Sequence, residues 1–435
     1  MEREDETIED FDFPKEEPSI IKVIGVGGGG GNAVNHMYRK GIQNVSFAVC
    51  NTDNKALSNS LVPYRLQLGK EGLGAGNRPE RGCEAAEESI EEIRQMLSDG
   101  TRMVFITAGM GGGTGTGAAP IIAREAKAMD ILTVGIVTIP FMFEGRVKID
   151  QALDGVDEIS KHVDALLVIN NERLREIYTD RTMLDAFARA DDTLSIAARS
   201  ISDIITVKGR INLDFNDVRS VLKDGGVAIM STGYGEGEKR VTKAIQEALN
   251  SPLLNNSDIF KSKRVLLHIS FCAASDGETL MMDEMNEVHE FMSRFASGVA
   301  TKWGFAIDAT LGKRVKITVL TTGAGLMSCF LEPKQEQKEK EVLISEEENF
   351  EKKQKRLEVF YGKGLQKVVP VKRHLQFYCF TEDDLDNEQV ISLVKDTPTY
   401  KRSKELYNQI KKVTNPFSSP PFSADTDAAK AICFS

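Results

Sequence analysis

Two glycine-dense stretches, residues 25–32 and 109–117, carry the clearest chemical signal in this sequence. Each follows an apolar run typical of a β-strand, Ile21–Val26 and Met103–Thr107, and precedes a helix-like segment. Free backbone N–H groups and the positive end of a helix bind phosphate at such a junction. Glycine allows the backbone to approach the ligand closely. Two such loops predict a polyphosphate ligand.

We predict that both loops contact the ligand, mainly through backbone groups. The predicted contacts are Gly28, Gly29, Gly30, Gly31, Gly111, Gly112, Gly113, Gly115 and Gly117, with hydroxyl donors from Thr114 and Thr116. Asn32 either caps the first helix or contacts the ligand, and the sequence leaves both roles open.

The first loop alone also fits a dinucleotide-binding fingerprint, with Asp53 after the second strand-like run. The second loop favours a nucleoside triphosphate with Mg²⁺, because a dinucleotide fold has no use for a second group of amides interleaved with hydroxyls. A flexible glycine linker is disfavoured, since a helix is predicted to continue from Pro120 with proline in its first turn. The chain has no P-loop sequence.

The sequence GGGTGTG at 111–117 closely resembles the signature of the tubulin/FtsZ family of GTPases. The resemblance extends from about Ile20 to about Gly325. Supporting matches lie at 51–53, 72–76, 140–145 and 212–218. The resemblance implies a GTPase that uses GTP, GDP and Mg²⁺.

The resemblance also assigns roles to individual residues. The loop with Gly72, Ala75 and Gly76 would close over the γ-phosphate. Glu144 and Lys148 would lie near the ribose. The family usually has arginine in place of Lys148, and lysine lacks the planar guanidinium group of arginine. The guanine site would comprise Asn171, Phe187 and Asp192, with Asp191 beside it; which of the two aspartates faces the base is left open.

Three polar residues after the central helix, Asn212, Asp214 and Asp217, are the candidates for hydrolysis. Their types also suit a helix cap and a turn. About 16 helical residues at about 1.5 Å each would place the acids roughly 24 Å from the base. We therefore expect them to act on the nucleotide of a neighbouring copy stacked head to tail, which propagates into a filament.

Strand-like runs alternate with amphipathic stretches, which is typical of a parallel sheet flanked by helices. The predicted strands are Ile21–Val26, Val45–Cys50, Met103–Thr107, Leu132–Ile139 and Ala165–Asn170. The predicted fold class is α/β: a Rossmann-like parallel-sheet GTPase domain, a long central helix over Asp192–Val207, and a smaller α+β C-terminal domain with two helices on one sheet, as in tubulin. The predicted boundaries are a disordered acidic arm (1–18), the GTP-binding domain (19–190), the central helix and catalytic loop (191–224), the second domain (225–326), and a largely disordered linker and tail (327–435) with a short docking helix or a weakly structured polar segment near its end.

The net charge of −10 disfavours nucleic-acid and anionic-membrane surfaces. No apolar run is long enough to span a membrane, no signal peptide is evident, and the six scattered cysteines suit a reducing compartment. We expect a cytoplasmic protein without direct membrane insertion.

The resemblance implies self-assembly into the scaffold of the bacterial cytokinetic ring at midcell. Membrane-tethering and regulatory division proteins would bind through the C-terminal tail, although residues 415–435 match the family's tail pattern poorly. The alternatives are a nucleotide-binding oxidoreductase, a scaffold relative that binds GTP without hydrolysing it, and a eukaryotic tubulin, which Thr116 and the short chain after the second domain disfavour.

Overall fold

The computed structural model describes residues 19–177, 182–206, 209–211, 213–250, 259–273, 279–296, 298–323, 356–358, 360–361 and 388–395. The chain divides into two compact units, Met1–Leu365 and Gln366–Ser435. Within the first unit the strands form one 11-stranded sheet in the order β3-β2-β1-β4-β5-β6-β8-β11-β9-β10-β7. The α/β class predicted from the sequence is confirmed.

The first six strands of this order are parallel and form the half of the sheet that carries both glycine loops. They are β1 (Ile21–Val26), β2 (Ser46–Asn51), β3 (Tyr64–Gln67), β4 (Met103–Gly109), β5 (Leu132–Ile139) and β6 (Ala165–Asn170). The predicted strands coincide with β1, β5 and β6. β3 was not predicted, because half of this short edge strand is exposed and its residues lack a continuous apolar run.

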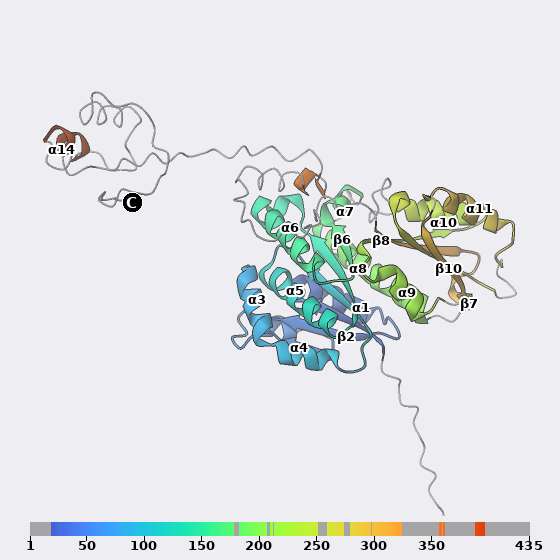
Figure 1. Ribbon diagram of the computed structural model, residues 1–435, viewed down its shortest axis with the longest axis horizontal. Helices are drawn as coiled ribbons and strands as arrows, with labels where there is room; N and C mark the ends of the chain where they lie inside the picture. The colour runs from blue at the N-terminus through green and yellow to red at the C-terminus, as the bar shows by residue number, and fades with distance from the viewer. Residues whose placement is uncertain are drawn as a thin grey trace, which may run out of the picture. The chain divides into compact units, whose positions relative to one another are not determined.

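Helices cover both faces of the parallel half-sheet (Figure 1). Alternate residues of β1 join different cores: Ile21 and Val23 join the core with α1, whereas Ile24 and Val26 join the core with α5 and α6. The helices of this half are α1 (Gly27–Arg39), α2 (Asn54–Ser58), α3 (Pro79–Glu88), α4 (Ile90–Leu97), α5 (Gly113–Ala128), a 3₁₀ turn (Met142–Glu144), α6 (Arg146–Ser160) and α7 (Asn171–Ile177).

Helix α5 begins at Gly113, so Pro120 lies inside the helix and not in its first turn as predicted. Proline lacks the N–H that would bond to the carbonyl one turn earlier. The helix nevertheless continues to Ala128, because most of its residues are buried and it packs in the core with β1, β4 and α6. The helix start therefore coincides with the second glycine loop.

The central helix, α8 (Met183–Thr206), begins earlier than the predicted Asp192. It contributes Leu194, Ala197 and Ile201 to the same core as β1 and α1. The strand β7 (Gly209–Ile211) and helix α9 (Phe215–Leu222) follow it. This long helix connects the parallel half to the second half of the sheet (Figure 1).

The second half of the sheet is mixed and joins the first through only two residue pairs between β6 and β8. Its strands are β8 (Gly226–Gly235), β9 (Arg264–Phe271), β10 (Ala300–Ile307) and β11 (Val315–Thr322), with β7 at its edge beside β10. Helices α10 (Arg240–Leu249) and α11 (Glu284–Ser293) share a separate core with these strands. The predicted α+β arrangement of two helices on one sheet agrees with this. Short 3₁₀ turns lie at Ile259–Lys261 and Ala309–Leu311.

In the second unit, the described element is α14 (Glu388–Lys395), where the sequence suggested a docking helix. Residues 1–18, which form the predicted acidic arm, lie outside the described residues. Within the described ranges, no helix combines the length and apolar character needed to cross a bilayer.

Candidate functional site

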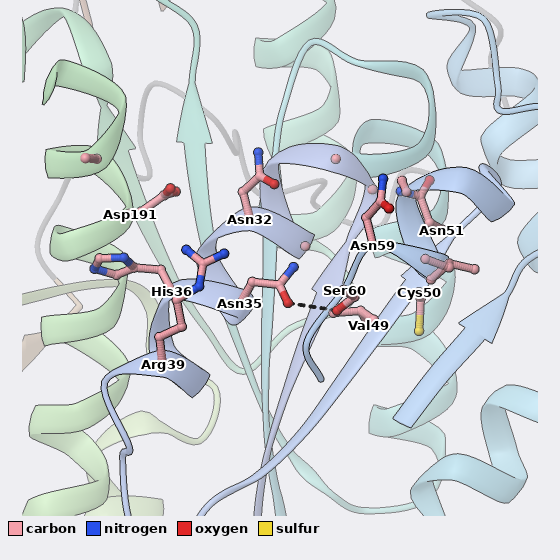
Figure 2. Close-up of a pocket in the computed structure, with 16 residues that line it drawn as sticks. Asn32, Asn35, His36, Arg39, Val49, Cys50, Asn51, Asn59, Ser60 and Asp191 are labelled. Carbon is pink, nitrogen blue, oxygen red and sulfur yellow. Dashed lines mark hydrogen bonds between the residues drawn. The ribbon is translucent and has the colours of Figure 1, made fainter. Parts of the chain in front are cut away.

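A cavity of about 480 Å³ opens at the carboxyl ends of the parallel strands, a usual place for ligands in such sheets. Its size suits a small-molecule ligand. The start of α1, the end of β2, and α8 contribute to its walls (Figure 2). The lining residues are Gly27, Gly28, Gly31, Asn32, Asn35, His36, Arg39, Val49, Cys50, Asn51, Ala56, Leu57, Asn59, Ser60, Ala188 and Asp191.

The two glycine loops meet beside this cavity because glycines allow their backbones to touch. A Cβ on Gly30 would lie 2.2 Å from the carbonyl oxygen of Thr107, at the end of β4. A Cβ on Gly27, whose φ is +72°, would lie 2.8 Å from the backbone nitrogen of Gly115. The helices α1 and α5 therefore begin next to each other, and their N-terminal N–H groups share one region.

The predicted phosphate-binding glycines fall into two groups. At Gly28, Gly31 and Gly112, no atom lies within 4 Å of the position that a Cβ would take, so space is open there for a ligand. Gly117 and Gly115 are packing positions, where a Cβ would lie 2.0 Å from the Pro79 oxygen and 2.5 Å from the Gly109 oxygen, respectively.

Gly29 and Gly113 are also close to neighbouring atoms. A Cβ on Gly29 would lie 3.3 Å from the Gly109 Cα, and one on Gly113 would lie 2.8 Å from the Ala75 Cβ. The requirement for glycine at these positions therefore arises partly from packing between loops.

The hydroxyls of the second loop have partners inside the protein. Thr116 is buried, and its Oγ1 accepts a hydrogen bond of 2.9 Å from the N–H of Gly111. The Oγ1 of Thr114 lies 2.6 Å from that of Thr52, at the end of β2. These bonds hold the second loop in shape and connect it to the neighbouring strand. The predicted donation from both hydroxyls to phosphate stays a prediction.

The loop 72–76 is attached to the same edge of the sheet. The N–H of Gly74 donates to the Thr52 carbonyl at 3.0 Å, and the Gly72 carbonyl accepts from the Asn54 N–H at 3.0 Å. Gly72, Gly74 and Gly76 all have positive φ, and Ala75 is buried against Gly113. The loop thus contacts the second glycine loop through Ala75. Asp53 caps α2 by accepting the Lys55 N–H at 2.8 Å.

Asn32 lies in the second turn of α1, whose N-cap is Val26, so it does not cap this helix. It lines the cavity, which favours the alternative that it contacts the ligand (Figure 2).

The two adjacent aspartates of α8 point in different directions. Asp191 lines the cavity, whereas an oxygen of Asp192 lies 2.7 Å from Nε2 of His36 and also contacts the Lys40 ammonium. Burial raises the pKa of Asp191 to about 6; His36 opposes this and Asp192 adds to it. Burial also acts on Asp192, but hydrogen bonds from Lys40 and His36 hold its pKa below the usual value. Asp191 is therefore the carboxylate available to a ligand.

Of the remaining predicted base and ribose residues, Asn171 follows the end of β6 and Glu144 lies shortly after the end of β5. Asn171 is buried at the start of α7, and its Oδ1 has no hydrogen-bond partner among the described residues. Phe187 belongs to α8, but its side chain lies outside the described part of the chain. Glu144 accepts the Phe141 N–H at 2.8 Å through one oxygen and pairs with Lys148 at 2.5 Å through the other. The predicted Glu144–Lys148 neighbours are thus in contact.

Sequence reasoning missed several polar residues that line the cavity on one face of α1. Asn35, His36 and Arg39 follow Asn32 at helical spacing, and this polar stripe is the signal that would have found them. Asn35 Oδ1 accepts hydrogen bonds of 2.8 Å from both the Ser60 hydroxyl and the Leu61 N–H. Asn35 thereby fixes the far wall of the cavity to α1 (Figure 2).

The predicted catalytic acids lie at the start of α9 and not in the cavity. Asp214 accepts the Asp217 N–H at 2.8 Å, and Asp217 accepts the Asp214 N–H at 3.2 Å. This reciprocal arrangement is a capping box. Lys302 of β10 lies 2.9 Å from Asp217, and its hydrogen bond is the main cause of the lowered pKa of that carboxyl. Asn212 lies outside the described residues.

Most of the length of α8 separates Asp191 from Asp214 and Asp217 along the chain. From Asp191 the helix continues to Thr206, a rise of about 22 Å at about 1.5 Å per residue. The acids follow that end in the chain. One subunit therefore does not bring its own acids to its own cavity by any local rearrangement of α9.

Comparison with known proteins gives a consistent family match. Residues 20–179 match the GTPase domain of the tubulin/FtsZ family, residues 226–325 match the C-terminal domain of the FtsZ family, and residues 372–416 match a further C-terminal FtsZ family. A cell division protein FtsZ from Porphyromonas gingivalis is 59% identical over 71% of this chain and 68% of its own length.

Other relatives agree. A cell division protein FtsZ from Azotobacter vinelandii is 46% identical over 71% of this chain and 78% of its own. Among solved structures, an FtsZ dimer from M. jannaschii is 38% identical, covers 71% of this chain and 89% of its own, and has a TM-score of 0.64.

The two groups of glycines generate a first prediction. Gly30→Ala places a Cβ against the backbone of β4 and is expected to lower the free energy of unfolding by about 1–3 kcal/mol. Gly28→Ala has room for its methyl group, so we expect its stability to change by less than about 0.5 kcal/mol. The same methyl group points to open space at the cavity and should weaken GDP binding.

Urea unfolding without nucleotide measures the first effect, and titration with GDP measures the second. The division is wrong if Gly28→Ala unfolds the protein while Gly30→Ala leaves its stability unchanged.

Proposed function

The chain belongs to the tubulin/FtsZ family of GTPases, and from this membership we propose that two copies stacked head to tail share each site of GTP hydrolysis. The protein is a tubulin-like GTPase of cell division, and it associates with itself. The alternatives of an oxidoreductase and of a eukaryotic tubulin are not supported. The observation that carries the shared site is the separation of Asp191 from Asp214 and Asp217 by most of α8.

For the phosphates, the proposal relies on the adjoining N-termini of α1 and α5. Their N–H groups and positive helix ends attract a phosphate chain without a lysine in a P-loop. Gly28, Gly31 and Gly112 leave room for close approach. The loop with Gly72 and Gly76 contributes the wall beyond the last phosphate, since it is bonded to the end of β2 and touches Gly113.

For the base, we propose that Asp191 is the residue that recognises guanine. A carboxylate accepts hydrogen bonds from both N1–H and the exocyclic amine of guanine, and adenine does not present this pair of donors. Asp192 supports the site by joining α8 to His36 and Lys40 of α1. Glu144 accepts from the ribose hydroxyls, with Lys148 holding its second oxygen; Asn171 and Phe187 complete the base site.

For hydrolysis, we propose Mg²⁺ as a cofactor, which would neutralise charge at the phosphates when it is bound with the nucleotide. Asp214 and Asp217 of the next copy, with Asn212, orient the attacking water. Phosphoryl transfer requires positioning and electrostatic stabilisation more than covalent chemistry.

At the cellular level, we propose that the filaments form the scaffold of the cytokinetic ring at midcell. Tethering and regulatory proteins are proposed to bind the C-terminal tail. Helix α14 supports this, because Ile391 is an exposed apolar residue on a short helix outside the GTPase unit.

Asp191 generates a prediction on pH. Its raised pKa means that acid protonates it at about pH 6, and the neutral form loses one of the lone-pair sites that guanine needs. GDP affinity should therefore be full above about pH 7 and fall by up to about tenfold per pH unit below pH 6. Asp191→Asn should remove this slope, because an amide does not titrate.

Calorimetric titration between pH 5 and 8 measures this dependence. His36→Gln is the control for the nearby imidazole and should keep the slope. A slope that persists in Asp191→Asn and vanishes in His36→Gln contradicts the assignment.

The shared site predicts complementation between two inactive variants. Asp217→Ala keeps the cavity and is expected to bind GTP without hydrolysing it, while Gly28→Ala keeps the acids but binds GTP weakly. A mixture of the two should recover turnover, because a Gly28→Ala copy can present its acids to GTP held by an Asp217→Ala copy. Phosphate release, measured together with light scattering, reports this.

Wild-type protein provides the reference, since its turnover per subunit should rise at the concentration where scattering begins. Lys302→Ala is the matched control, because it removes the ion pair to Asp217 and keeps both acids. Turnover that is independent of concentration, or a mixture as inactive as its components, would show that each subunit holds a complete site.

A further inference from the structure

A short helical segment from the predicted tail, residues 356–358 and 360–361, packs on the GTPase half of the sheet. Leu357 and Tyr361 are 1% and 9% exposed and belong to the same core as Ile149, Leu153 and Val156 of α6. Phe360 packs against this core as well. Figure 1 shows the segment as the short orange helix near α6. Burial of these two large side chains stabilises the docked position of the segment.

Specific polar contacts fix the position of this segment. The Tyr361 hydroxyl donates to the Pro140 carbonyl at 2.6 Å, and Asn170 Nδ2 donates to the Phe360 carbonyl at 2.7 Å. Arg356 contacts Asp157 of α6 and lies 3.7 Å from Asp154. The contacts reach the ends of β5 and β6 and one face of α6, so a nonspecific apolar collapse does not explain them.

The segment bonds to the beginning of the loop that holds the proposed ribose contact. Pro140 directly precedes Phe141, whose N–H donates to Glu144. On the other side, Glu172 accepts the Met142 N–H at 2.9 Å. Burial, together with the charges of Glu144 and Glu172, raises the pKa of the Tyr361 hydroxyl.

We propose that the described residues of this segment, 356–358 and 360–361, form an intramolecular clamp that positions Glu144 for the ribose, with Tyr361 as the positioning residue. The inference rests on the proposed nucleotide site. It adds that the affinity of this site for the ribose depends on a segment outside the two matched domains, 20–179 and 226–325. Without the clamp, the loop 141–144 keeps its bond to Glu172 but loses its support at Pro140 and at the end of β6. The proposed phosphate and base contacts do not involve this loop.

The clamp predicts a loss of affinity that depends on the ribose hydroxyls. Leu357→Asp should release the segment, because it places a charge in the core. We expect this variant to bind GDP about fivefold to tenfold more weakly than the wild type, and to bind 2′,3′-dideoxy-GDP with unchanged affinity. Tyr361→Phe should show the same pattern with a smaller loss, since it removes only the bond to Pro140.

Calorimetry on the full chain, below the concentration at which it assembles, measures both nucleotides. Ile391→Asp is the matched control, because it makes the same kind of change at an exposed residue of α14 and should bind both nucleotides as the wild type does. Hydrogen exchange of residues 141–149 gives an independent readout, and it should accelerate in Leu357→Asp and stay unchanged in Ile391→Asp.

A peptide with the sequence of residues 352–364 tests whether the docking surface is a true site. It should bind Leu357→Asp, slow the exchange of residues 141–149 and restore GDP affinity. The clamp is refuted if Leu357→Asp loses affinity for both nucleotides equally, or if exchange and GDP affinity are unchanged. Failure of the wild type to bind GDP would instead refute the proposed nucleotide site.

Discussion

The contact between the backbones of two loops is the constraint on which the rest of this structure depends. Gly30 meets the carbonyl of Thr107, and Gly27 meets Gly115, at distances that a side chain would not permit. This contact sets the starts of α1 and α5 next to each other at the ends of β1 and β4. Two helix ends directed to one region provide more positive potential than either supplies alone. The position of the cavity and the proposed binding of a polyphosphate follow from this arrangement.

Much of the fold could be predicted because buried parallel strands are continuous apolar runs. β1, β5 and β6 have the predicted bounds, since both of their faces are covered. β3 and β7 could not be found in this way, because both are short strands at the edges of the sheet. β3 is partly exposed and β7 has only three residues, so neither shows a clear pattern of apolar residues. The start of α8 was predicted too late because the prediction did not use Thr182, whose hydroxyl accepts the Asp185 N–H at 3.2 Å and caps the first turn of the helix.

The candidate site shows where local sequence information ends. The sequence identified both glycine loops, but it does not distinguish Gly28, which faces open space, from Gly117, which packs against Pro79. That difference depends on residues far away in the chain. The choice between Asp191 and Asp192 likewise depends on His36 and Lys40, which reach α8 from another helix and pair with Asp192.

The electrostatics of the catalytic candidates restrict what they can do. Asp217 forms an ion pair with Lys302 and accepts a hydrogen bond from the backbone N–H of Asp214. Its pKa is lowered. A carboxylate that is held ionised is a weak base, so it is poorly suited to take a proton from water at neutral pH. It is well suited to accept a hydrogen bond and orient a water molecule. The capping box fixes both acids at a helix start before any partner arrives, which reduces the reorganisation required when a neighbouring copy docks. The same contacts that stabilise α9 in one subunit thus hold its acids in place for their proposed role at the nucleotide of another.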